Sequence, residues 1–275
     1  MRRYLPGLLL VSPALAIIVF LFLVPLGGAV TGAFQDPDGG FSFGNFFKTY
    51  QLYSTDIIFT IVIVALSAIL TAAFSVAIAG YLTLCNSPVA VAILRWLYRW
   101  PLFIPFIVVG QILRTFLAKN GLMNNIFVAT GLITPLHTVG FLDWRGVVIA
   151  FVWKQTPFVT LLLAGAMASI DRGTIEAARN LGASRLRILL EIVLPQAAPT
   201  LMVGLTLSVV TMMSVLSVPL MIASQSPTVI TVDMAFRINA YGDYGVANAL
   251  GLVSLLLTGA VAWIYLRQTM RENVR

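Results

Sequence analysis

The chain has 275 residues, of which 59% are hydrophobic and 10% are charged. Soluble globular domains carry about 25% charged residues. Lipid must therefore be the solvent for much of this chain, and the net charge of +7 fits positive loops beside a membrane better than a nucleic acid partner. One cysteine and one histidine exclude a zinc cluster or a Cys/His catalytic pair, so we expect no metal site.

Six apolar segments reach the roughly 20 residues that a membrane-spanning helix needs. In chain order they cover about residues 7–33, 57–84, 100–117, 146–166, 197–222 and 244–266. The third is interrupted by Pro101 and Pro105. The first exceeds the roughly 7–15 apolar residues of a cleavable signal peptide, so we expect an uncleaved anchor helix. The sequence therefore predicts an all-α membrane protein with six transmembrane helices in one domain, residues 1–275.

The distribution of Lys and Arg predicts the orientation of these helices. With the N-terminus inside, eleven basic residues fall on the cytoplasmic side and four on the external side. The cytoplasmic set is Arg2, Arg3, Arg95, Arg99, Arg172, Arg179, Arg185, Arg187, Arg267, Arg271 and Arg275. The external set is Lys48, Lys119, Arg145 and Arg237. We therefore expect both termini to be cytoplasmic.

The most polar connection, residues 171–195, lies between the fourth and fifth predicted spans. It reads as two short helices at an angle. Thr174 is the expected N-cap of the first, with Glu176 in its first turn, and Gly182 is the expected residue with φ > 0 that ends it. Ser184 is the expected cap of the second helix, and Pro195 ends this helix or begins the next span. Its predicted apolar stripe is Leu186, Leu189, Leu190 and Val193.

Physical reasoning alone leaves open that this segment is an amphipathic loop on the membrane surface. The residues also follow the pattern E-A-A-x-x-x-G, then nine variable residues, then I-x-L-P. In this pattern the segment resembles the EAA motif of ABC importer permeases. The matching residues are Glu176, Ala177, Ala178, Gly182, Ile192, Leu194 and Pro195. Residues from about 50 to 267 are similar to the permease domain of the maltose and spermidine/putrescine importers.

The resemblance implies a transmembrane permease subunit of an ATP-driven importer in the bacterial inner membrane. It implies a coupling helix around residues 176–181 that docks on an ATPase. The expected partners are a second permease subunit (similar or identical), two ATPase subunits, an external solute-binding protein and membrane lipid. The chain has no G-x-x-x-x-G-K-[ST] loop, so we expect no enzyme activity and no cofactor in this chain, with ATP and Mg²⁺ in the ATPase subunits.

Polar residues inside the predicted spans are candidates for the translocation path. They are Lys154, Gln155, Met212, Met213, Ser214 and Ser217. For Lys154 the alternatives are snorkelling or pairing with a carboxylate of the partner permease, and for the others helix packing. If Lys154 faces the path, it disfavours a strongly cationic substrate, so we expect a small polar solute that is neutral or anionic. The segment Leu181-Gly-Ala183 instead resembles the polyamine, iron and phosphonate branch.

Two other classes of function compete with the importer permease. A secondary carrier or channel that works without ATPases is disfavoured by the motif and by the lack of a carboxylate inside a predicted span. A membrane-embedded enzyme ranks last because no catalytic constellation lies within the bilayer. The substrate itself cannot be read from the sequence.

Overall fold

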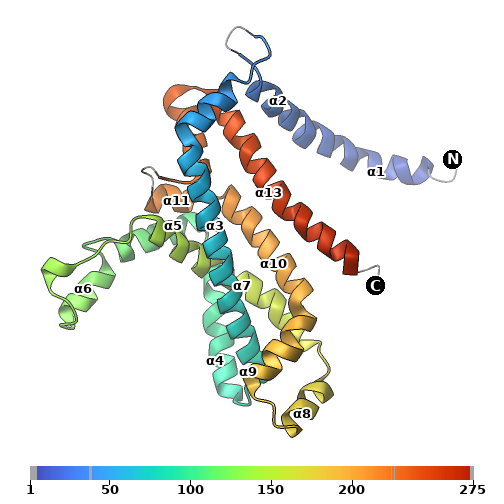
Figure 1. Cartoon of the computed structure of the whole chain (residues 1–275), viewed down its shortest axis with the longest axis vertical. Helices are drawn as coiled ribbons and strands as arrows, with labels where there is room; N and C mark the ends of the chain where they lie inside the picture. The colour runs from blue at the N-terminus through green and yellow to red at the C-terminus, as the bar shows by residue number, and fades with distance from the viewer. Residues whose placement is uncertain (1–4, 37–38, 224, 226, 273–275) are drawn as a thin grey trace. The chain divides into compact units, whose positions relative to one another are not determined.

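The computed structural model describes residues 5–36, 39–223, 225 and 227–272, and Figure 1 shows their arrangement. The regular elements in these ranges are helices, and a single isolated bridge joins Gln35 and Phe41. Five helices are long and apolar enough to cross a membrane, and a bent helix pair makes a sixth span. The prediction of an all-α protein with six transmembrane helices is confirmed. Arg2, Arg3 and Arg275 of the orientation argument lie outside the described residues.

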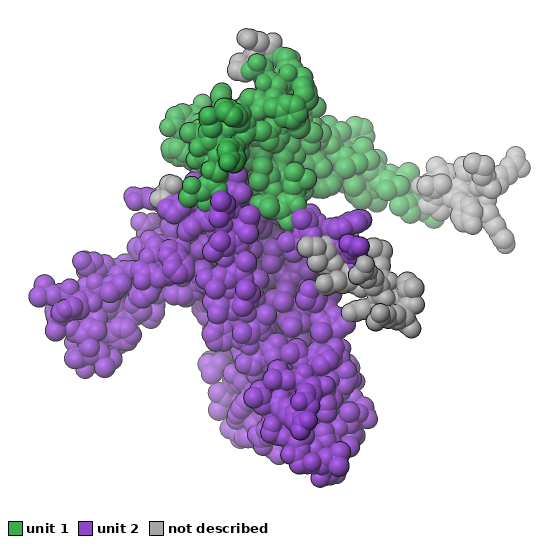
Figure 2. Space-filling view, in the orientation of Figure 1, with its two compact units in different colours: residues 1–55, 233–257 green, residues 56–232, 258–275 purple. Residues whose placement is uncertain are grey.

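The chain divides into two compact units, which Figure 2 colours separately. The first contains residues 1–55 and 233–257, and the second contains residues 56–232 and 258–275. The expectation of a single domain, with an anchor helix at 7–33 and a core at 50–267, stays a prediction.

The first unit holds the predicted anchor and parts of two long helices. The anchor is α1 (Leu5–Ile18), a π-helical turn (Val19–Leu23) and α2 (Val24–Ala33), which ends where predicted. After it, α3 (Gly44–Leu84) begins, and α13 (Tyr244–Glu272) follows Gly242, whose φ of +62° only glycine adopts readily. The Arg237 guanidinium donates to the Tyr53 hydroxyl and lies 3.6 Å from the Asp243 carboxylate. These contacts join α3 to the turn before α13.

The second unit contains most of the remaining helices. They are α4 (Pro88–Arg99), a 3₁₀ turn (Trp100–Phe103), α5 (Phe106–Leu117), α6 (Leu122–Ala129), α7 (Trp144–Ala168), α8 (Arg172–Asn180), α9 (Arg185–Ile188), a π-helical segment (Leu189–Val193), α10 (Leu194–Ser214) and α11 (Ser217–Ile222). The boundary between the units falls within α12 (Ile230–Phe236). The fifth span runs over Arg185–Ser214 instead of residues 197–222, because α9, the π segment and α10 form one helix and the chain breaks after Ser214.

The third span is broken, as Pro101 and Pro105 suggested. The axis bends by 107° between residues 88–103 and 106–129. Pro105 cannot donate a backbone N–H, so helical hydrogen bonding cannot continue through it. The α7 helix passes this break and also packs against α10, which makes α7 the central helix of the unit.

Candidate functional site

The segment that resembles the coupling motif begins with α8, whose ends are both capped. Asp171 is the N-cap, and its Oδ1 accepts a hydrogen bond of 3.1 Å from the Gly173 N–H. The prediction of Thr174 as N-cap is wrong. Asp171 lies one turn earlier and reaches the free N–H groups first, so Thr174 falls inside the helix and its hydroxyl lies 3.5 Å from Asp171 Oδ2. Glu176 follows the first turn, where the structure places no acidic residue.

The other end of α8 has the predicted glycine. Gly182 has a φ of +79° and donates to the Arg179 carbonyl at 2.9 Å, while Ala183 donates to the Ala178 carbonyl at 3.0 Å. These two bonds form a Schellman motif, which turns the chain sharply toward α9. The prediction that Gly182 adopts a positive φ and ends the helix is confirmed.

The second helix of the segment starts at the predicted cap, because the Ser184 hydroxyl accepts from the Arg187 N–H at 3.3 Å. Its apolar stripe differs from the predicted one. Leu189 and Val193 are buried, but Leu186 and Leu190 are 64% and 51% exposed. The fully buried Ile188 takes their place. The helix adds a π turn at residues 189–193, and an i→i+5 turn rotates the inward face relative to a regular helix.

The inner face of α8 is fixed to the rest of the unit by packing and by one cation. Ile175 is 7% exposed and belongs to an apolar cluster of the second unit. That cluster comprises Ala79, Leu84, Leu163, Met167, Ile175, Ile188, Leu189, Val193 and Ala197. The Arg179 guanidinium donates to the Leu84 carbonyl at 3.1 Å, at the last residue of α3. A displacement of α8 is therefore transmitted to α3, α7 and the α9–α10 helix.

The outer face of α8 carries the first part of the motif. Glu176 and Ala177 are exposed, and Leu181 is 89% exposed. Ala178 is half-buried against the apolar cluster, as is Leu194 of the second part. Ile192 is also half-buried, and Pro195 is exposed where the helix continues from the π segment into α10, a position at which it cannot donate a helical hydrogen bond. The motif thus supplies both a buried side and an accessible side.

Lys154 lies in the middle of α7, and its ammonium group binds the broken span. Lys154 Nζ donates to the carbonyls of Pro101 at 2.7 Å, Leu102 at 3.1 Å and Ile104 at 2.6 Å. It also lies 5.2 Å from the centroid of the Phe106 ring. The residue is 9% exposed, and three carbonyls match the three N–H groups of an ammonium. Sequence reasoning did not anticipate these partners, because they lie about 50 residues away.

The other path candidates differ in burial and in hydrogen bonding. Gln155 is 4% exposed, and its Nε2 has no hydrogen-bond partner among the described residues. Met212 and Met213 are buried, Ser217 is half-buried, and Ser214 is exposed and donates to the Val210 carbonyl at 2.7 Å. Sequence reasoning missed further buried hydroxyls on α3, α7 and α10 that have no partner within the described ranges. In the second unit they are Ser67, Thr71, Thr156, Thr160 and Ser208, and in the first unit Thr49.

Burying a hydroxyl without a hydrogen-bond partner costs free energy, and the cost is higher in a bilayer. Several such hydroxyls on neighbouring helices therefore need an explanation. Single Ser and Thr residues in apolar helices give little signal in the sequence, because their hydroxyls are often satisfied by the preceding turn of the same helix. Only the packing of the three helices shows that these hydroxyls are buried without partners.

One family of known proteins matches most of the chain. Residues 78–269 match the family described as binding-protein-dependent transport system inner membrane component. The trehalose/maltose transport system permease protein of Thermococcus litoralis is 32% identical over 152 residues, which cover 54% of this chain and 51% of that protein. The sulfoquinovosyl glycerol transport system permease protein of Agrobacterium fabrum is 26% identical, over 68% of this chain and 63% of that protein. This chain thus spans about half to two thirds of these two relatives.

A third relative and two solved structures extend the comparison. A putative 2-aminoethylphosphonate transport system permease protein of Salmonella typhimurium is 27% identical, over 63% of this chain and 67% of that protein. A bacterial alginate ABC transporter has a chain with a TM-score of 0.82 at 21% identity, and the match covers 98% of this chain and 96% of that chain. A chain of a methionine ABC transporter gives a TM-score of 0.60 at 16% identity, over 82% of this chain and 97% of that chain. At these identities the likeness concerns the fold.

Proposed function

Because the chain belongs to the family of binding-protein-dependent transport system inner membrane components, we propose that it forms half of the translocation pathway of an ATP-driven ABC importer. Its partners are a second permease subunit, two ATPase subunits that hold ATP and Mg²⁺, and an external solute-binding protein. It lies in the bacterial inner membrane with both termini in the cytoplasm, the orientation that the eleven-to-four distribution of basic residues favours.

The observation that carries this proposal is the two-sided construction of α8. The outer face presents Glu176, Ala177 and Leu181 on a short helix with small side chains, which suits close docking in a groove of another protein. The inner face is held by Ile175 and Arg179. A movement of a partner protein bound to the outer face would therefore move α3, α7 and the α9–α10 helix together with α8.

The mechanism follows from this rigid connection. Closure of the ATPase pair on ATP binding draws α8 with it, and the apolar cluster moves the cytoplasmic ends of α3, α7 and α10. These same helices carry the buried unpaired hydroxyls and Gln155. When the helices move apart, the hydroxyls gain water or solute as hydrogen-bond partners, which offsets part of the free energy of opening. Hydrolysis of ATP and release of the products reset the cycle.

The substrate is a small polar solute, neutral or anionic. The names of the relatives refer to trehalose/maltose, sulfoquinovosyl glycerol and 2-aminoethylphosphonate, all rich in oxygen acceptors. Hydroxyl groups such as those of Thr156, Thr160 and Ser208 serve both as donors and as acceptors, so they suit such solutes. A polycation offers only hydrogen-bond donors, and these hydroxyls include no carboxylate that could pair with its charges.

The test is ATP-dependent uptake by the importer, reconstituted from this chain and its ATPase, partner permease and binding-protein subunits. Ala177→Trp places a large ring on the outer face of α8 and should reduce both ATPase association and uptake at least tenfold. Ala129→Trp is the matched control, an exposed alanine of α6 on the expected external side, and should leave both unchanged. Maltose, 2-aminoethylphosphonate and putrescine serve as test solutes. Uptake that persists without ATPase subunits would contradict the proposal and favour a secondary carrier.

A further inference from the structure

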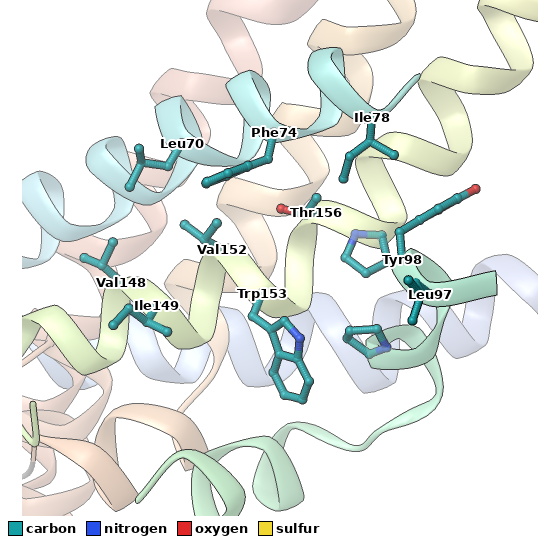
Figure 3. A pocket seen from close by; sticks show the side chains of 12 residues that line it. Leu70, Phe74, Ile78, Leu97, Tyr98, Val148, Ile149, Val152, Trp153 and Thr156 are labelled. Atoms are coloured by element: carbon teal, nitrogen blue, oxygen red, sulfur yellow. The ribbon is translucent and has the colours of Figure 1, made fainter. Parts of the chain in front are cut away.

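A groove in two parts lies along the second unit between α3, α4 and α7. Its first part, about 440 Å³, has almost only apolar side chains, which Figure 3 shows: Leu70, Phe74 and Ile78 come from α3, and Val152 and Trp153 from α7. Its second part, about 360 Å³, begins one turn further along the same helices. There Thr83 follows Ile78 on α3, and Leu161 follows Pro157 on α7. Tyr98 of α4 lines both parts, so they meet at this side chain.

The second part is basic and lies at the end of the unit that holds α8. Arg95 and Arg99 of α4 and Arg172 of α8 line it, without a carboxylate in the lining. None of the three forms an ion pair within the described ranges. Arg99 is oriented at the junction, because its Nε lies 3.3 Å from the Tyr98 hydroxyl and its guanidinium 5.7 Å from the Tyr98 ring centroid. Three arginines that line one hollow suit a phosphate or another compact anion.

The apolar part has the size of an acyl chain. At a rise of about 1.5 Å per residue, the stretch of helix from Leu70 to Ile78 is about 12 Å long. Both residues line the groove, so it accepts a chain that lies along the helix axis. A free phosphate would use the arginines and leave this part unused, whereas a phospholipid uses both. Basic pockets between transmembrane helices on the cytoplasmic side are a known way of binding anionic head groups.

We propose that this groove binds one anionic phospholipid of the cytoplasmic leaflet. Its phosphate lies among Arg95, Arg99 and Arg172, and one acyl chain extends past Tyr98 along α3 and α7. The proposal uses the orientation given above but not ATP-driven transport. Because Arg172 belongs to α8 and Ile175 also lines the basic part, the head group touches the segment that docks on the ATPase.

The protein and its partner subunits are placed in bilayers of dioleoyl phosphatidylglycerol and dioleoyl phosphatidylcholine and then purified in detergent. The experiment measures which of the two lipids stays bound. Native mass spectrometry counts the bound lipids, without ATP or solute, so its outcome is independent of transport. We expect phosphatidylglycerol to be retained preferentially. The double variant Arg95→Gln, Arg99→Gln should weaken retention about 25-fold, since each arginine near the surface contributes roughly a factor of five. The double variant Arg185→Gln, Arg187→Gln removes equal charge outside the groove and should have little effect.

A second pair of variants tests the acyl part. Val152→Trp fills the apolar groove and should abolish preferential retention, whereas Val62→Trp, an exposed residue of α3 that does not line the groove, should preserve it. Equal retention of the two lipids, or equal loss in both arginine variants, would overturn the proposal. Displacement of the lipid by inorganic phosphate, with no effect of Val152→Trp, would mean that the arginines bind a free anion and would overturn it too. So would a disulfide between Val152→Cys and the partner permease, because a protein would then cover the groove.

Discussion

Replacement of Lys154 by methionine tests whether its ammonium group holds the broken span in place. In a regular helix the Pro101 carbonyl would accept from the N–H of residue 105, but that residue is a proline and has none. The Pro101 carbonyl accepts instead from the Ile104 N–H at 3.3 Å and from Lys154 Nζ at 2.7 Å. The same ammonium binds the carbonyls of Leu102 and Ile104. Methionine keeps the length of the side chain and removes every donor.

The cost follows from three hydrogen bonds. In membrane proteins such bonds contribute about 0.6–1.7 kcal/mol each, so Lys154→Met should lower the free energy of unfolding by about 2–5 kcal/mol. Lys154→Arg keeps donors with a different geometry and should restore part of this stability. Unfolding in mixed micelles with increasing dodecyl sulfate, followed by far-ultraviolet circular dichroism, measures the difference. Lys119 is exposed and serves as the control. Lys119→Met should change stability by less than about 0.5 kcal/mol, as surface substitutions usually do.

The result that would refute this reasoning is a Lys154→Met protein as stable as the unmodified one. If that variant also took up putrescine faster, Lys154 would face the translocation path and act by repelling cations, which is the role expected from the sequence. If stability falls and the preference among solutes is unchanged, Lys154 is a positioning residue for the broken span.

Three further predictions concern the coupling segment, the N-terminal cap of α7 and the topology. Gly182 has a φ of +79°, so Gly182→Val forces a β-branched residue into the left-handed region. This variant should lose about 1–2 kcal/mol of stability and reduce ATPase association without affecting membrane insertion. Gly40→Val, at an open glycine, should have no such effect. The Arg145 side chain donates to Asp143 and lowers the pKa of that carboxyl below its ordinary 3.8. The pair is partly exposed, so it should add only slightly to the free energy of unfolding at pH values above the ordinary pKa. This contribution should disappear as the pH falls through the lowered pKa of Asp143. The measurement is the free energy of unfolding as a function of pH. The same acid dependence in Asp143→Asn and in the unmodified protein would contradict the prediction. Reporter fusions should read external after Gly44 and Gly242 and internal after Asn86 and Arg185, and a reversed pattern would refute the orientation.

The amino-acid sequence by itself determined the features that depend on neighbouring residues. The lengths of the apolar segments predicted six spans, and the two prolines predicted the break in the third. Gly182 predicted the turn after α8, because a left-handed residue at a helix end is a local requirement that few other residues meet. The motif identified the family, which the match over residues 78–269 supports.

The tertiary structure decided which partners the polar groups find and which side of a helix faces inward. Lys154 finds carbonyls about 50 residues away, a pairing that arises only when α7 packs against the break. Asp171 replaces Thr174 as cap, and a π turn exposes Leu186 and Leu190, because the buried face depends on contacts with α3 and α7 as well as on the spacing of apolar residues. The unpaired hydroxyls of Thr160 and Ser208 show the same dependence, since burial belongs to the packed helices and to no single one of them.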